Sequence, residues 1–275
     1  MPAASTTEKA AGIAFDRFGS GDPLLLIHGT GGSRAHWQPL LGLLQGHREL
    51  IVLDLPGHGD SDPPPPGSAH TPSTYATRLA ELLDQLGLET AHAVGNSVGG
   101  WTALELAKLG RARSVVAVSP AGLWPGRDPR RATLSLWAQR KLGRLLAPIV
   151  PAMLRSETGR TLIMSGTVAK PRDLPADAAI NMFQAYIRTP TFDVHLKQTR
   201  RERFEGGKTI KVPTTIVWGG KERLLPPRAR RTDELPAHAE VLTLPDCGHV
   251  PMWDNPRALA SVILKGTTAT RTHAQ

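Results

Sequence analysis

Six short apolar runs, bounded by glycine and proline, alternate along this chain with stretches of helical periodicity. This alternation is typical of a parallel sheet built from βαβ units. The stretches 36–44, 74–86 and 101–109 carry apolar residues at spacings of three and four, so we expect helices that cover the sheet faces. The expected strands are Leu24–Ile27, Leu50–Leu53, Thr90–Val94, Ser114–Val118, Thr214–Trp218 and Val241–Leu244.

The alternation stops near Trp124 and resumes at Ile210. Between Trp124 and about Gly207, helical patterns and prolines continue without a convincing strand. From Ile210 the pattern predicts one more strand, helix, strand and helix. A chain of 275 residues can form one large domain. We therefore expect a single α/β domain with a helical insertion.

Composition excludes several classes of protein and site. Cys247 is the only cysteine, which excludes an intramolecular disulfide, a zinc ribbon and an iron–sulfur cluster. The longest uncharged apolar stretch, Leu145–Leu154, has ten residues, whereas a membrane-spanning helix needs about 20. The first residues lack the apolar segment of a secretory signal, so we expect a cytoplasmic protein. No metal or cofactor is expected.

The formal charge of +9 is concentrated in the insertion. From Trp124 to Glu205, fifteen Lys and Arg residues face seven Asp and Glu residues. Such an excess fits nucleic acid, an anionic surface or acidic substrates, but charge runs most often form a solvated helical face. Because no aromatic-interleaved or helix-turn-helix pattern accompanies the charge, we expect no nucleic-acid partner.

Gly95-Asn96-Ser97-Val98-Gly99 follows an expected strand and precedes an expected helix. This is the G-x-S-x-G spacing in the strand–turn–helix context that presents a serine nucleophile. The tight turn strains the serine backbone, and the flanking glycines leave room for the strand to approach the helix. Ser97 is therefore the candidate nucleophile, and a chance match in a glycine-rich chain is the alternative.

Two later residues complete a candidate triad. His249 follows the last expected strand, and its place fits the hydrolase order of nucleophile, acid and histidine. Glu222 lies in the loop after Thr214–Trp218 and would orient the imidazole. The loop after Val118 offers no carboxylate, and Asp246 is the next candidate acid. An exposed ion pair with Arg223 is the alternative role for Glu222.

His28-Gly29-Thr30-Gly31-Gly32-Ser33 follows the first expected strand. A glycine-rich turn there can aim a backbone N–H at a developing oxyanion, with Thr30 as one donor and Val98 as the other. The stretch matches neither G-x-G-x-x-G nor the P-loop, so nucleotide binding is not expected.

These motifs together resemble the α/β-hydrolase superfamily. The resemblance rests on His28-Gly29, Asp54-Leu55-Pro56-Gly57-His58-Gly59, Gly95 to Gly100, Trp218-Gly219 to Pro226, and Gly248-His249. It implies a mostly parallel twisted sheet flanked by helices, a core of 1–123 and 206–275, and a helical cap of 124–205 over the serine. It also implies the triad Ser97, Glu222 and His249, with Glu where Asp is usual. Asp54 resembles a structural acid.

The expected activity is hydrolysis of an ester, thioester or lactone through an acyl-enzyme. A serine in the tight turn Gly95–Gly99, the nucleophile elbow, disfavours epoxide hydrolases and dehalogenases of this fold, which use aspartate there. A carbon–carbon bond hydrolase is the enzymatic alternative, because Asn96 resembles its Gly-Asn-Ser-Met-Gly-Gly elbow, although Val98 replaces Met. A non-catalytic ligand receptor and a cofactor-free perhydrolase on this fold also stay open.

The insertion suggests the kind of small-molecule substrate. It is rich in aromatic and soft apolar residues, so we expect an apolar pocket for an acyl group, although packing against the core explains many of these residues equally well. An inward arginine would instead favour acidic substrates. The candidate substrate-binding residues are Trp124, Trp137, Phe183 and Tyr186.

Overall fold

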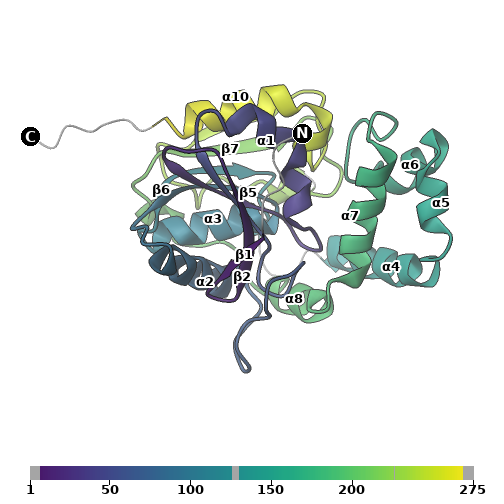
Figure 1. Ribbon diagram of the computed structural model, residues 1–275, viewed down its shortest axis with the longest axis horizontal. Helices are drawn as coiled ribbons and strands as arrows, with labels where there is room; N and C mark the ends of the chain where they lie inside the picture. Colours follow the sequence, from purple (N-terminus) through teal and green to yellow (C-terminus); the bar gives the residue numbers. More distant parts are fainter. Residues whose placement is uncertain (1–6, 126–129, 226, 269–275) are drawn as a thin grey trace, which may run out of the picture.

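One eight-stranded sheet forms the centre of the part of the chain that the computed structural model describes, residues 7–125, 130–225 and 227–268 (Figure 1). Its strand order is β1-β2-β4-β3-β5-β6-β7-β8. β3 to β8 are parallel, whereas β2 pairs antiparallel with both β1 and β4. The strands are β1 Glu8–Ala10, β2 Ile13–Phe18, β3 Pro23–Ile27, β4 Glu49–Leu53, β5 Ala91–Asn96, β6 Ala112–Val118, β7 Thr214–Gly219 and β8 Glu240–Leu244.

The six expected strands are confirmed within a few residues at each end. Their apolar runs are long enough to span a sheet that is covered on both faces. The antiparallel β1–β2 hairpin was not expected from the sequence. Its turn places Ala11 at φ 50° and Gly12 at φ 73°, the left-handed conformation that tight hairpins need.

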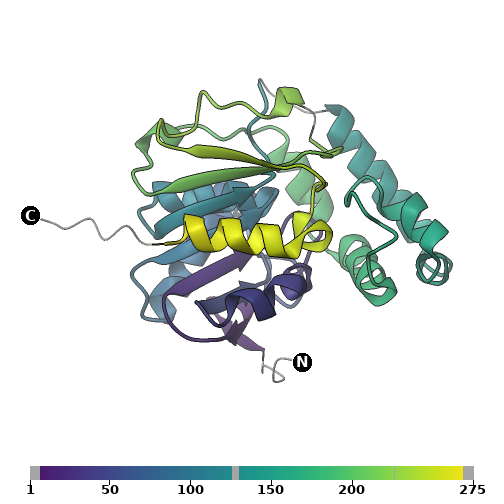
Figure 2. The same cartoon turned by 90° about the horizontal axis from the view of Figure 1, so that it is seen from above.

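Helices cover both faces of the sheet (Figures 1 and 2). α2 and α3 pack together on one face, and α1 packs with α9 and α10 on the other. Each face has its own cluster of buried apolar side chains. The helices are α1 Gln38–Leu44, α2 Pro72–Gln85, α3 Val98–Lys108, α9 Pro251–Asp254 and α10 Pro256–Gly266, with short 3-10 turns at Arg34–Trp37, Gly207–Thr209 and Pro227–Ala229.

Five helices between β6 and β7 lie to one side of the sheet (Figures 1 and 2). We call residues 130–199 the α4–α8 segment. Its described residues hold helices and no strand, and the boundaries 124–205 and the role as a cap stay a prediction. The helices are α4 Arg130–Leu145, α5 Val150–Leu154, α6 Glu157–Met164, α7 Ala176–Arg188 and α8 Phe192–Thr199.

The expected helix between the last two strands is wrong. Among the described residues between β7 and β8, the 3-10 turn Pro227–Ala229 is the only helical element. Pro227 and Pro236 cannot donate backbone hydrogen bonds, and the charged stretch between them buries Ala229 and Leu235, too few apolar residues for a helix face. Arg127, Asp128, Pro226 and both chain ends, to which parts of the sequence analysis refer, lie outside the described residues.

No helix in the described ranges is long and apolar enough to cross a membrane.

Candidate active site

Ser97 lies at the sharp turn between β5 and α3. Its backbone has φ 57° and ψ −118°, a conformation that is costly for a residue with a side chain. The turn is held from outside, because the Ser97 N–H donates to Val118 O at 2.8 Å and Ala121 N–H donates to Ser97 O at 3.0 Å. The structure therefore has the strained serine geometry that the sequence motif predicts.

The two glycines of the motif are required by close backbone approach. A Cβ on Gly95 would lie 2.1 Å from Gly99 O, and a Cβ on Gly99 would lie 2.2 Å from Ile27 O. Side chains at either position would push α3 away from the sheet. The G-x-S-x-G spacing thus has the steric cause inferred from the sequence.

Glu222 and His249 form a hydrogen-bonded pair. The Nδ1 atom of His249 lies 2.6 Å from Oε2 of Glu222, and both side chains are buried. Burial alone would raise the pKa of Glu222, but His249 and the backbone N–H groups of Leu224 and Leu225 outweigh it and lower this pKa to about 2. Glu222 is therefore an ionised acceptor, and the imidazole keeps its proton on Nδ1.

Asp246, the other candidate acid of the triad, has a different partner. It is exposed and forms an ion pair with Lys221 at 2.9 Å. Glu222 also makes no exposed pair with Arg223, whose guanidinium donates to Ser165 O at 3.2 Å. The geometry favours Glu222 as the partner of His249.

Two side chains that the sequence analysis did not assign hold the His249 loop. Asn96, next to the serine, donates to His249 O at 2.9 Å and to Val118 O at 3.2 Å. Asp254 accepts from Gly248 N–H at 2.7 Å and from Ala169 N–H at 2.9 Å. Asn96 therefore ties the elbow to the histidine loop, and Asp254 ties that loop to the α4–α8 segment.

The loop after β3 lies directly beside the serine. A Cβ on Gly29 would lie 3.0 Å from Cβ of Ser97. Gly32 N–H donates to Gly29 O at 3.0 Å and closes a turn around Thr30. Val98 is the first residue of α3, so its N–H has no acceptor within the helix. The two candidate oxyanion donors thus come from adjacent segments.

Thr30 is held by a histidine that the sequence analysis missed. Nε2 of His195, in α8, lies 3.0 Å from the Thr30 hydroxyl. Nδ1 of His195 lies 2.9 Å from His70 O, so Nδ1 carries the proton and Nε2 accepts from Thr30. His195 is buried, which lowers its pKa to about 3 and keeps it neutral. The sequence offered one signal that His195 is buried: Phe192, His195 and Thr199 are spaced i, i+3 and i+7 and so lie on one face of a helix.

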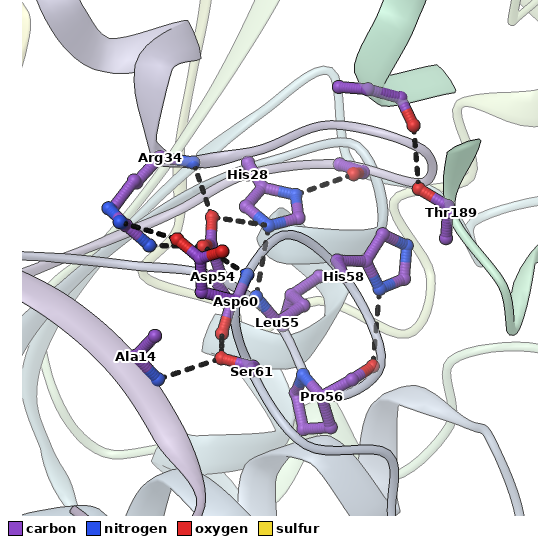
Figure 3. A network of polar contacts seen from close by, with 12 residues as sticks. Ala14, His28, Arg34, Asp54, Leu55, Pro56, His58, Asp60, Ser61 and Thr189 are labelled. Atoms are coloured by element: carbon purple, nitrogen blue, oxygen red, sulfur yellow. Dashed lines mark hydrogen bonds and ion pairs between the residues drawn. The ribbon is translucent and has the colours of Figure 1, made fainter. Parts of the chain in front are cut away.

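A second polar network holds the two ends of the loop after β3, at His28 and at Arg34 (Figure 3). Asp54 accepts from Arg34 N–H at 2.8 Å and from Asp60 N–H at 3.0 Å, and it pairs with the Arg34 guanidinium. His28 donates to Gly29 O at 2.7 Å and accepts from Leu55 N–H at 2.9 Å. Asp54 is therefore a structural acid, as the resemblance implied.

The four candidate substrate-binding residues lie in different places. Tyr186 reaches the Thr30 loop, since a Cβ on Gly31 would lie 2.7 Å from its ring. Phe183, in α7, packs against Gly143 of α4. Trp124 is buried edge-on against Trp101, with ring centroids 5.6 Å apart. Trp137 is 41% exposed, on α4. Of the four, Tyr186 contacts the loop that carries the candidate oxyanion donor Thr30.

Two arginines of the α4–α8 segment are buried, Arg140 and Arg160. Arg160 donates to the backbone carbonyls of Leu154, Arg155 and Arg172. Arg140 is 2% exposed, but its Nη1 pairs with Asp193 at 2.8 Å and its other nitrogens donate to Tyr186 O and Thr189 O. Its charge is already compensated and its donors are occupied. Arg140 therefore joins α4 to the α7–α8 turn.

The described residues contain no group of three or more His, Cys, Asp or Glu side chains arranged to hold a metal ion. The site's polar groups instead form the pairs described above.

The chain is similar to known proteins over most of its length. The profile described as "Alpha/beta hydrolase family" matches residues 24–262. "Lipase 1" of Psychrobacter immobilis is 29% identical over 262 residues, which cover 89% of this chain and 78% of that protein. "Epoxide hydrolase EphH" of Mycobacterium tuberculosis is 31% identical over 199 residues, which cover 70% of this chain and 92% of that protein.

A solved structure shares the whole architecture. A membrane phospholipase A, described as a bacterial virulence factor, superposes with a TM-score of 0.73 at 25% sequence identity. The match covers 96% of this chain and 86% of that chain.

Proposed function

Because this chain belongs to the alpha/beta hydrolase family, we propose that it is a serine hydrolase that cleaves a carboxylic ester, thioester or lactone through Ser97, His249 and Glu222. The observation that carries the proposal is the 2.6 Å contact between His249 Nδ1 and Glu222 Oε2, next to a serine in strained geometry. Lipase relatives support a carboxylic ester hydrolase-like enzyme.

The pairing supplies the base that the reaction needs. With its proton fixed on Nδ1, neutral His249 has a free lone pair on Nε2. That nitrogen takes the Ser97 proton while Oγ attacks the substrate carbonyl carbon. The tetrahedral intermediate collapses and the leaving alkoxide takes the proton from His249. Water, deprotonated by His249, then attacks the acyl-enzyme and releases the acid.

The oxyanion is bound by the N–H groups of Thr30 and Val98. The contact between Gly29 and Ser97 and the N-terminal position of Val98 in α3 support this assignment. Donors fixed in place before the reaction need no reorganisation when the negative charge develops.

The α4–α8 segment is proposed to be a cap over this site, within the boundaries 124–205. It contacts three of the loops around the triad, through Tyr186 at Gly31, Thr191 at Gly57 and Val168 at Gly248. Tyr186 and Phe192 present rings 5.0 Å apart beside the Thr30 loop, and Arg140 is compensated by Asp193. These contacts favour an apolar acyl group over an acidic one.

The carbon–carbon hydrolase stays the enzymatic alternative, although the residue that suggests it also has a structural role. Asn96, on which that resemblance rests, bonds to His249 O and Val118 O and so has a structural reason to be present. A serine at the elbow likewise sets this chain apart from the aspartate chemistry expected of epoxide hydrolases on this fold.

Turnover of a substrate panel tests the proposal. Purified protein is offered p-nitrophenyl esters of increasing chain length, lactones and vinylogous diketones, with Ser97→Ala beside it. Ser119→Ala is the matched control, because Ser119 also has positive φ (44°) and directly follows the neighbouring strand β6. We expect ester turnover that is lost only in Ser97→Ala. Ligand binding without turnover of any compound would indicate a receptor instead.

A further inference from the structure

α4 has an inner face that accounts for its packing. The side chains of Thr133, Leu136 and Arg140 and the backbone of Gly143 follow one another at spacings of three and four, so they share one face of the helix. Thr133 and Arg140 are buried, and Gly143 lies against Phe183 and Ile187 of α7. One face of α4 therefore packs on α7, and the opposite face has no packing role in the described chain.

That opposite face is apolar although it faces solvent. Leu134, Trp137 and Leu145 lie on it at spacings of three and eight, with exposed fractions of 58%, 41% and 76%. Leu142 at 56% and Ile149, just beyond the helix, at 55% extend it. A surface helix normally carries polar residues there. We call Leu134, Trp137, Lys141, Leu142, Leu145 and Ile149 the outer α4 surface.

Exposed large apolar side chains concentrate here. Among the described residues, nine large hydrophobic side chains are exposed, and five of them belong to the outer α4 surface. Leu162 and Val194 lie elsewhere in the α4–α8 segment, and Leu109 and Val241 lie outside it. A contiguous apolar patch of this kind marks an interaction surface, whereas scattered single residues do not.

The charge around the surface has one sign. Residues 129–156 contain six Arg and Lys residues and no Asp or Glu. Lys141 lies in the outer row itself, with its ammonium 3.9 Å from the Trp137 ring centroid. Arg144 and Arg155 are also exposed, and none of these three residues forms an ion pair with another described residue. The surface thus combines leucine and tryptophan with uncompensated positive charge.

We propose that the outer α4 surface docks onto an anionic phospholipid bilayer. Helices that lie in a bilayer interface combine apolar residues, including tryptophan, with lysine and arginine that meet anionic headgroups. A second copy of this chain fits less well, because the docking of two outer α4 surfaces would oppose like charges. α4 lies at the outer edge of the segment, where a flat surface can reach it (Figures 1 and 2).

The inner face of α4, opposite the outer α4 surface, is connected to the candidate site. The Tyr186 hydroxyl donates to Leu136 O of α4 at 2.6 Å, and the Tyr186 ring contacts Gly31 of the Thr30 loop. The lipid-facing helix and that loop are therefore joined through one side chain. The docking itself does not depend on hydrolysis.

Vesicle binding tests the docking. The full chain is sedimented with vesicles of phosphatidylcholine alone and with vesicles that also contain phosphatidylserine. We expect binding to the mixed vesicles. Leu142→Gln/Leu145→Gln should weaken it at least about tenfold, and Lys141→Glu/Arg155→Glu should weaken it at low salt. Leu109→Gln/Val241→Gln removes equally exposed apolar groups elsewhere and should bind as the parent does.

Three outcomes would overturn the docking proposal. The parent protein does not bind mixed vesicles, or the Leu142→Gln/Leu145→Gln variant binds as the parent does, or sedimentation velocity shows a dimer that these leucine substitutions dissolve in the absence of lipid binding. Hydrolysis of a soluble short ester, measured on the same preparations, reports separately on the proposed function. It should be unchanged in the leucine variant.

Discussion

At the scale of single residues, the glutamate in place of the usual aspartate has a structural use. Its longer side chain lets Oε1 accept from Leu224 N–H at 2.7 Å and Leu225 N–H at 3.1 Å while Oε2 holds His249. The carboxylate thereby fixes its own loop and the imidazole together. An aspartate from the same backbone would be too short to keep all three contacts.

Glu222→Gln should lower kcat by about two to four orders of magnitude, because the amide no longer fixes the imidazole tautomer or stabilises the imidazolium. The measurement is steady-state hydrolysis of an activated ester that the parent turns over. Asp246→Asn is the control, since Asp246 is exposed and bound to Lys221, and it should leave kcat within about twofold. A large loss in Asp246→Asn with near-parent activity in Glu222→Gln would reverse the assignment.

His195 gives a second prediction at this scale. His195→Phe and Thr30→Val should each lower kcat about tenfold to a hundredfold with little change in KM, because each releases the loop that carries an oxyanion donor. The double variant should lose no more than either single one, since both remove the same hydrogen bond. Additive losses in this double-mutant cycle would show that the two residues act independently.

The residues that sequence could identify are those defined by local spacing. Ser97, Gly95 and Gly99 are fixed by one turn, and His249 by its place after the last strand. His195 could not be assigned, because its partner Thr30 lies 165 residues away and only the fold brings them together. Trp137 was expected among the substrate-binding residues because of its residue type. Its position on the outer α4 surface could not be predicted, because the sequence does not show which face of α4 packs on α7.

At the scale of elements, periodicity predicts those that bury a continuous apolar face. The parallel strands and α2 and α3 follow from it. The β1–β2 hairpin escaped detection because its first strand, Glu8–Ala10, has three residues and no buried side chain. The expected helix after β7 failed because prolines interrupt a charged stretch. Element type thus follows from sequence where burial is strong, and less where it is weak.

The α4–α8 segment is expected to select uncharged acyl groups. A medium-chain neutral ester should have a higher kcat/KM than its carboxylate-bearing analogue, and the ratio should change little with salt, because Arg140 is compensated by Asp193. Arg140→Met should lower Tm without altering the ratio. A preference for the acidic ester that salt abolishes would show that a free positive charge faces the substrate.

At the scale of the whole molecule, buried histidines link stability to pH. Burial lowers the pKa of His36 and His58 to about 4 and that of His195 to about 3. Their rings lie near one another, with His58 and His195 centroids 5.9 Å apart and His28 and His36 centroids 6.4 Å apart. Each is neutral in the folded protein at a pH where the unfolded chain binds a proton.

The free energy of unfolding should therefore be highest above about pH 6.5. It should fall as the pH drops from about 6.5 to about 4, because in this range the unfolded state binds more protons than the folded state. Each histidine contributes a slope of about 1.4 kcal/mol per pH unit within that window. Urea unfolding at a series of pH values measures the slope. His36→Leu should reduce it, and the exposed control His47→Gln should not. A stability that is constant across this range would contradict the account.

The central claim is that Ser97 carries the acyl group during turnover. Rapid mixing with an activated ester, acid quenching and peptide mass spectrometry measure it directly. The account predicts a burst of product equal to one equivalent of enzyme, with the acyl group on the peptide that contains Ser97 and with neither burst nor adduct in Ser97→Ala. Turnover by the parent with no acyl adduct on Ser97, or an unchanged burst in Ser97→Ala, would contradict it.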